Sequence, residues 1–195
     1  SGLGGVTYKN NIIIQDTLAG GIAACKHANG RDWWVVMIKE NSDLVYKILF
    51  TPQGIASITT QNLVIDPAIF VDPQITFSQD GTQFACQKTD GGVVKEHFVR
   101  VLDFDRCTGD FSNPRVFDLS GAIGWGLAFS PSGKYVYACS SSNIFQINID
   151  SLTVDTVASY DGFISPPNLT CCATTFWNMY LAANGKIYIT SGSGV

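Results

Sequence analysis

The chain has 195 residues and a formal net charge of −4; 46% of the residues are hydrophobic, 12% aromatic and only 14% charged. This length supports one domain with a substantial core, and the high apolar content argues against disorder. There is no basic stripe to neutralise phosphates and no run of about 18 apolar residues, so we predict neither nucleic-acid binding nor a membrane span.

Residues 6–15, VTYKNNIIIQ, favour a short β-hairpin, which we interpret as the end of a repeated unit. The preceding SGLGG lacks an initiator Met and a signal-peptide pattern. We therefore expect the chain to have been processed, trimmed or taken from something longer.

Four later segments share one pattern, in which a glycine-containing turn separates two apolar runs. They are CKHANGRDWWVVM, TFSQDGTQFACQK, AFSPSGKYVYACS and YLAANGKIYITSG. The glycines are 51, 52 and 52 residues apart, at Gly30, Gly81, Gly133 and Gly185. The residues before them are Asn29, Asp80, Ser132 and Asn184. Asn-Gly and Asp-Gly favour two-residue turns, because both positions tolerate positive φ, so each copy is predicted to open with a tight hairpin.

A second hairpin is predicted in each of the first three copies, with turns at residues 51–54, near 105–109 and near 150–151. Four antiparallel strands at a period of about 50 residues are typical of a β-propeller blade. The predicted division is the end of a blade at 1–19, one blade each at 20–68, 69–120 and 121–163, and a connector with the start of a blade at 164–195.

The fold class is thus predicted to be all-β, because no segment has the apolar period of a helical solenoid. A β-sandwich is the main rival, but it does not predict hairpins at a constant spacing. The blades are expected to form either an arc of a larger propeller or a small four-bladed ring. In the ring, the half-blades at the two ends would pair and leave no exposed edge.

The stretch KHANGRDWW, residues 26–34, concentrates polar and aromatic chemistry, yet we interpret it as the first hairpin of the first full copy. Trp33 and Trp34 are expected to point to opposite faces and to be buried by neighbouring blades. Arg31 and Asp32 are expected beside the turn, either solvated or bonded to nearby groups. The equivalent places in the other copies hold Phe77, Phe129 and Leu181, which carry no matching acid or base.

No catalytic residue, metal ligand or cofactor is predicted. The expected inner strands, IAAC, ITFS, GLAFS and MYLAA, contain no carboxylate, and His27 and His97 are the only histidines. Asp72, Glu96 and Asp161 lie in connectors, and Asp103 and Asp105 are expected at a turn. The six cysteines match no zinc pattern and allow fifteen disulfide pairings, although Cys86 and Cys139 favour buried free thiols.

The connector over residues 161–179 is the longest irregular stretch, and long loops on rigid scaffolds often bind ligands. Pro166, Pro167, Phe176 and Trp177 are therefore the candidate binding residues, although the aromatic side chains could equally be tucked into an ordinary crossover.

HANGRDWW, DFDRCTG and FSPSGKYVY resemble elements of a family of secreted bacterial propeller-like proteins, which often carry a C-terminal type IX secretion sorting domain; the last element is shared with WD40-like and YVTN-type propellers. The resemblance runs from about residue 12 onward. It implies an extracellular or outer-surface location and no defined enzymatic activity, and it favours the arc because the propeller continues on both sides in that family.

Three functions remain open from the sequence. The leading one is a non-catalytic propeller module that binds protein or glycan in adhesion or surface assembly. The others are a propeller hydrolase or lactonase with an axial metal, and a structural subunit of a surface filament or complex. Expected partners are protein or glycan at the cell surface, with further propeller blades or another copy of the chain as additional ones.

Overall fold

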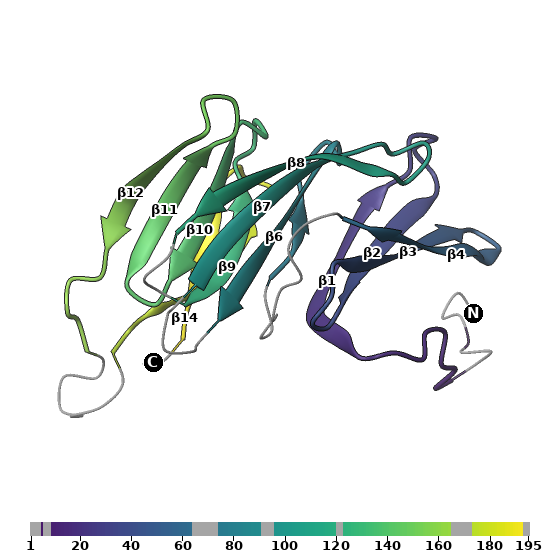
Figure 1. The fold of residues 1–195 in the computed structure, drawn as a ribbon, viewed down its shortest axis with the longest axis horizontal. Coiled ribbons are helices and arrows are strands. Elements are labelled where there is room, and N and C mark those ends of the chain that lie inside the picture. The colour runs from purple at the N-terminus through teal and green to yellow at the C-terminus, as the bar shows by residue number, and fades with distance from the viewer. Residues whose placement is uncertain are drawn as a thin grey trace.

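The computed structural model describes residues 5, 9–63, 74–90, 96–119, 123–164 and 173–192, and within them every regular element is a β-strand. No helix in these ranges is long and apolar enough to cross a bilayer. Four separate antiparallel sheets follow one another along the chain (Figure 1).

The strands of each sheet are hydrogen-bonded in chain order. The first sheet comprises β1 (Leu18–Lys26), β2 (Trp33–Lys39), β3 (Leu44–Thr51) and β4 (Gly54–Asn62). The second comprises β5 (Thr76–Phe77), β6 (Gln83–Asp90), β7 (Glu96–Phe104) and β8 (Phe111–Asp118). The third comprises β9 (Gly124–Phe129), β10 (Tyr135–Ser140), β11 (Asn143–Asn148) and β12 (Thr153–Ser159). The fourth pairs β13 (Phe176–Leu181) with β14 (Ile187–Ser191).

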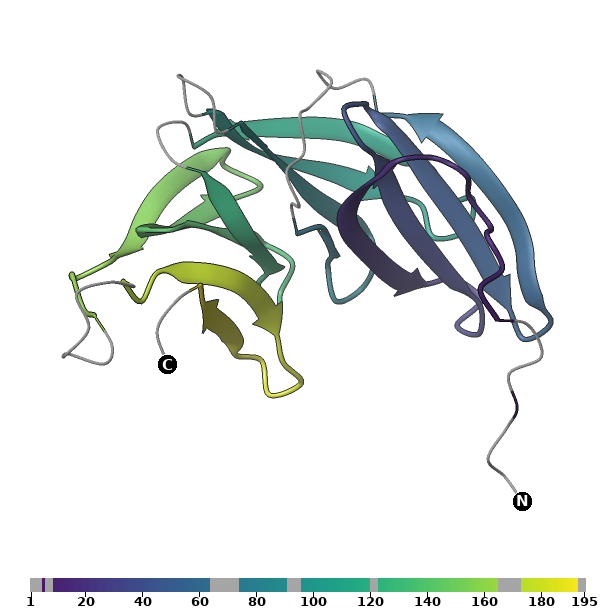
Figure 2. The ribbon, with the colours of Figure 1, turned by 90° about the horizontal axis from the view of Figure 1, so that it is seen from below.

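The sheets are arranged as an arc, with β1, β5, β9 and β13 on its inner side (Figure 2). They are not two facing layers, so the β-sandwich alternative is wrong. The four-bladed ring is also not formed by the described residues, because β14 pairs only with β13. The hairpin expected over residues 6–15 is likewise wrong for residues 9–15, which form no strand.

The four first hairpins share one turn geometry, which differs from the predicted two-residue turn. Only the glycine takes positive φ, between 72° and 76°, and its N–H donates to the carbonyl three residues earlier. The residue before each glycine instead accepts a hydrogen bond on its side-chain oxygen from the N–H two residues further on. These acceptors are Asn29 (3.0 Å), Asp80 (3.0 Å), Ser132 (3.4 Å) and Asn184 (3.1 Å). Asn, Asp and Ser occur at this position because their short side chains can accept a hydrogen bond from a nearby backbone N–H.

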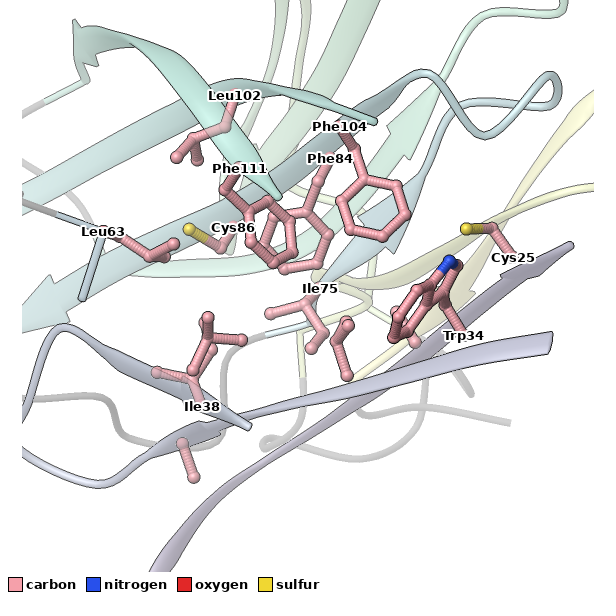
Figure 3. Packing of buried hydrophobic residues seen from close by; sticks show 14 residues of the cluster. Cys25, Trp34, Ile38, Leu63, Ile75, Phe84, Cys86, Leu102, Phe104 and Phe111 are labelled. Atoms are coloured by element: carbon pink, nitrogen blue, oxygen red, sulfur yellow. The ribbon is translucent and has the colours of Figure 1, made fainter. Parts of the chain in front are cut away.

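Neighbouring sheets pack through alternate residues of their strands. Between the first and second sheets lies an aromatic cluster of Phe77, Phe84, Phe104 and Phe111, whose neighbouring ring centroids are 4.8–5.1 Å apart. Trp34 lies beside it (Figure 3) and is 4% exposed. Because each sheet buries one face against the next, burial of large apolar side chains stabilises the stack by roughly 1.5–3 kcal/mol each.

Trp33 departs from the prediction that both tryptophans are buried, since its side chain is 43% exposed. It lies on the opposite face of the first sheet from Trp34, outside the core between the first two sheets, and it borders a pocket that Tyr180 of β13 also lines. Ile22, Ile55 and Ile58 are exposed with it. The prediction that Trp33 and Trp34 point to opposite faces of the sheet is therefore confirmed, whereas the prediction that both rings are buried is wrong for Trp33.

The cysteine chemistry agrees with the sequence where the structure describes it. Cys25, Cys86, Cys107 and Cys139 are free thiols, and all but Cys107 are buried. The prediction of buried free thiols at Cys86 and Cys139 is thus confirmed. Burial raises the pKa of Cys25 and Cys86 to about 12 and that of Cys139 to about 11.

Candidate functional site

The candidate site is the hollow on the inner side of the arc, where the innermost strands of the four sheets converge. Three adjoining pockets of about 310, 530 and 260 Å³ lie along it. All three are lined by Gln74, which lies just before β5, and by Tyr180 of β13. We call this hollow the axial channel.

Gln74 holds the inner strands of three sheets together. Its Oε1 accepts hydrogen bonds from the N–H of Leu127 in β9 (3.1 Å) and the N–H of Met179 in β13 (3.0 Å). Its Nε2 donates to the carbonyl of Met179 at 2.5 Å. Since Gln74 directly precedes Ile75 and β5, one amide side chain satisfies backbone groups that neighbouring sheet edges would otherwise leave unpaired. No pattern in the sequence indicated this role.

The pocket of about 530 Å³ lies at the end of the channel nearest the first two sheets. It collects residues from β1, the start of β2, β5 and the β5–β6 turn, the β7–β8 turn and β13. Its cationic side chains are Lys26 and Arg106, and its exposed aromatic side chains are Trp33 and Tyr180. The sequence could not have paired Lys26 with Arg106, because the two are brought together by packing of the second sheet on the first.

The backbone carbonyl of Arg106 links the second sheet to the first. The backbone oxygen of Arg106 accepts hydrogen bonds from the N–H of Ala28 at 3.1 Å and from Nε1 of Trp34 at 3.0 Å. His27 adds a third link, since its Nε2 lies 3.1 Å from the carbonyl oxygen of Cys107. The β7–β8 turn is therefore bonded to the first hairpin of the first sheet and closes one side of the pocket.

The polar residues of KHANGRDWW form a local network within the turn. Asp32 is buried, and its carboxylate accepts hydrogen bonds from Nε of Arg31 (2.8 Å) and Nδ2 of Asn29 (2.7 Å). The bonds from Arg31 and then Asn29 lower the pKa of Asp32, so the carboxylate is held as an anion by its neighbours. This arrangement agrees with the prediction that Arg31 and Asp32 are turn residues bonded to nearby groups.

The predicted contact residues of the 161–179 connector are placed only in part. Pro166 and Pro167 lie outside the described residues. Trp177 stacks on Trp125 with ring centroids 3.9 Å apart, and its carbonyl accepts a hydrogen bond from Sγ of Cys139 at 2.8 Å. Phe176 packs, half-buried, in the cluster that joins the third and fourth sheets. The structure thus places both aromatic side chains in contact between sheets, and it does not bring them into the axial channel.

The carboxylates considered from the sequence also have local partners, except Asp72, which lies outside the described residues. Glu96 pairs with Lys88 at 3.0 Å, and Asp103 pairs with Arg115 at 2.5 Å. Asp105 caps its turn, because its Oδ1 accepts the N–H of Cys107 at 2.7 Å. In the ranges that the structure describes, no three His, Cys, Asp or Glu side chains lie close enough together to hold one metal ion.

His97 is a buried titratable group between the second and third sheets, and its side chain is fully inaccessible to solvent. Its Nε2 lies 3.0 Å from Oε1 of Gln87, whose Nε2 donates to the carbonyl of Trp125 at 2.6 Å. Burial lowers the pKa of His97 to about 4, although nearby Asp118 acts in the opposite direction. His97 is therefore a neutral core residue at physiological pH and lies apart from the axial channel.

Comparison with known proteins shows the fold alone. No protein-family model matches the chain, and no curated protein matches it. Among solved structures, a candidate TolB from Agrobacterium tumefaciens aligns with a TM-score of 0.51 at 18% identity, over 87% of this chain and 53% of that one. A candidate 6-phosphogluconolactonase from Bacteroides uniformis gives 0.50 at 17%, over 88% and 46%. Kuenenia stuttgartiensis hydrazine synthase gives 0.50 at 14%, over 85% and 48%.

The chain is therefore an all-β protein of the β-propeller class, present as a partial propeller, as the sequence predicted. It spans about half the length of the solved structures that it matches. Hydrophobic clusters between neighbouring sheets and a channel lined by inner strands are the features by which this class is organised.

Proposed function

We propose that the chain is a non-catalytic propeller module, secreted or carried on the outer cell surface, that binds protein or glycan in adhesion or surface assembly. The observation that carries the proposal is the axial channel, into which exposed aromatic and polar side chains from four sheets converge. Concave sites of this size with a few convergent polar groups are typical of ligand-binding sites. The resemblance of HANGRDWW and DFDRCTG to secreted propeller-like proteins supports the location.

The binding role is tested by screening the purified chain on a glycan array and by pull-down against surface fractions. Wild-type protein and a Tyr180→Ala variant would be compared, with Tyr188→Ala as the matched control because Tyr188 is equally exposed, at 55%, but does not line the channel pockets. We expect a ligand whose retention falls in the first variant and not in the second. Absence of any ligand would contradict the proposal.

A hydrolase or lactonase with an axial metal is the competing catalytic function. Metal analysis of the purified protein, together with assays on lactone and ester substrates, discriminates between the two. A stoichiometric divalent ion together with turnover of a substrate would contradict the non-catalytic proposal and support the enzyme.

A structural role in a larger assembly is favoured by one specific observation. Ile22, Trp33, Ile55 and Ile58 are exposed on one face of the first sheet, where Ile22 and Trp33 also border the channel, and clustered exposed apolar residues mark interaction surfaces. Further propeller blades or a second copy of the chain are the partners we propose for it. Mass measurement in solution tests the second copy, because a strict monomer at high concentration would exclude self-association.

A further inference from the structure

The pocket of about 530 Å³ is lined by more cationic than anionic residues, although the chain as a whole is acidic. Lys26 and Arg106 both line it, and neither forms an ion pair with any residue that the structure describes. Lys26 is exposed, with its Nζ 5.7 Å from the centroid of the Trp33 ring. Two cationic residues that line one cavity, and that have no ion-pair partner among the described residues, are suited to binding an anionic group.

The carboxylate that lines this pocket, that of Asp80, forms no ion pair with those cations, and the lining keeps an excess of one positive charge. Oδ1 of Asp80 accepts hydrogen bonds from Oγ of Ser78 at 2.6 Å and from the N–H of Thr82 at 3.0 Å. Oδ2 of Asp80 accepts one from Oγ1 of Thr82 at 2.9 Å. Asp80 is thus committed to its own turn, and the guanidinium of Arg106 keeps its donors for a ligand.

The position of Arg106 is restricted before any ligand arrives. A Cβ atom added to Gly81 would lie 2.9 Å from Cδ of Arg106 and 3.2 Å from Cβ of Cys25. The side-chain stem is therefore packed between the β5–β6 turn and β1, while the backbone of Arg106 is fixed by its two accepted hydrogen bonds. A cation held in this way loses little conformational entropy on binding.

Two aromatic rings complete the pocket. Trp33 is 43% exposed and Tyr180 is 55% exposed, and they reach the pocket from β2 and β13, on different sheets. The apolar C–H faces of a pyranose pack on such rings, while the hydroxyl of Thr76 and the amide of Gln79 can bond its hydroxyl groups. The volume lies within the usual range for a small-ligand site.

We propose that this pocket binds a carboxylated saccharide, with the uronate carboxylate on Arg106 and Lys26 and a sugar face on Trp33 or Tyr180. The inference rests on the proposed binding function and assigns its ligand class. An acidic peptide would satisfy the cations but would make little use of the two rings, so we argue for the saccharide.

The test is binding of short oligogalacturonates to the full chain by calorimetry, with the fully methyl-esterified oligomer and poly-glutamate as probes. We expect the acid form to bind and the ester to lose most of its affinity. Lys26→Gln and Arg106→Gln should each weaken binding about 10- to 100-fold, the effect of losing one charge-assisted hydrogen bond. Lys26 is exposed, so its variant keeps the test valid if Arg106→Gln does not fold.

Lys134→Gln is the matched control, because Lys134 also stacks on an aromatic ring after a turn (5.5 Å from the Tyr135 centroid) but does not line this pocket. It should bind as the wild type does. Equal binding of the ester, unchanged binding in both pocket variants, no binding by the wild type, or stronger binding of poly-glutamate would each overturn the proposal. A different glycan retained equally by the Lys26 and Arg106 variants would refute this pocket while leaving the proposed function intact.

Discussion

Replacing Gly109 by alanine should destabilise the protein through contact with one buried ring. Gly109 is buried at the β7–β8 turn with φ of 77°, and an added Cβ would lie 2.7 Å from both Cη2 and Cζ2 of Trp34. Left-handed backbone costs a non-glycine residue about 1–2 kcal/mol, and overpacking a rigid core adds about 1–3 kcal/mol. We therefore expect Gly109→Ala to lower the free energy of unfolding by about 2–5 kcal/mol.

Gly30→Ala is the matched control, since Gly30 has φ of 73° but nothing within 4 Å of an added Cβ. Only the backbone cost of about 1–2 kcal/mol should appear there. Urea unfolding followed by tryptophan fluorescence measures both variants, and the pair Gly109→Ala with Trp34→Leu completes a double-mutant cycle. Equal losses in the two glycine variants, or zero coupling between Gly109 and Trp34, would refute the steric reasoning.

Three further predictions concern buried or half-buried groups. The unfolded state takes up a proton on His97 near pH 6.5, whereas the folded state does so only near pH 4. Stability is therefore lost as the pH falls, and between pH 7.5 and 4.5 the wild type should lose about 2–3 kcal/mol more than His97→Gln in urea unfolding. Gln74→Leu should cost about 2–4 kcal/mol and accelerate amide hydrogen exchange in β9 and β13, because backbone groups there lose their partner. With Cys171 and Cys172 replaced by serine, native protein should expose one thiol to a disulfide reagent, that of Cys107, and denatured protein four.

Each of these three has an outcome that contradicts it. Parallel pH profiles for wild type and His97→Gln would show that the pKa of His97 is not lowered in the folded state. Unchanged exchange rates in Gln74→Leu would show that the side-chain amide does not join the sheets. Rapid reaction of more than one native thiol would contradict the burial of Cys25, Cys86 and Cys139.

The hairpins were predictable because they depend on local chemistry. Glycine at a fixed interval and alternating apolar residues such as Ile147 and Ile149 specify turns and strand faces within a few residues. The second turns at residues 51–54, near 105–109 and near 150–151 formed where they were predicted. The error at the first turns was one of mechanism, since the Asn29 side chain acts as an acceptor and its backbone does not take positive φ.

The candidate site was not predictable in the same way. Phe176 and Trp177 were chosen because they lie in a long connector, but the structure packs them between sheets. The channel residues Gln74, Lys26 and Arg106 carry no local pattern, because their partners come from other sheets.

By itself, the sequence determined that this protein is a series of small antiparallel sheets of about fifty residues each, because hairpin turns and strand alternation are encoded over short distances. Only the tertiary structure decided which faces the sheets cover, leaving Trp33 exposed and Trp34 buried. It also decided that two cations eighty residues apart share one pocket. The physical reason is that burial and charge convergence depend on how whole sheets pack, and sheet packing is set by contacts between distant segments.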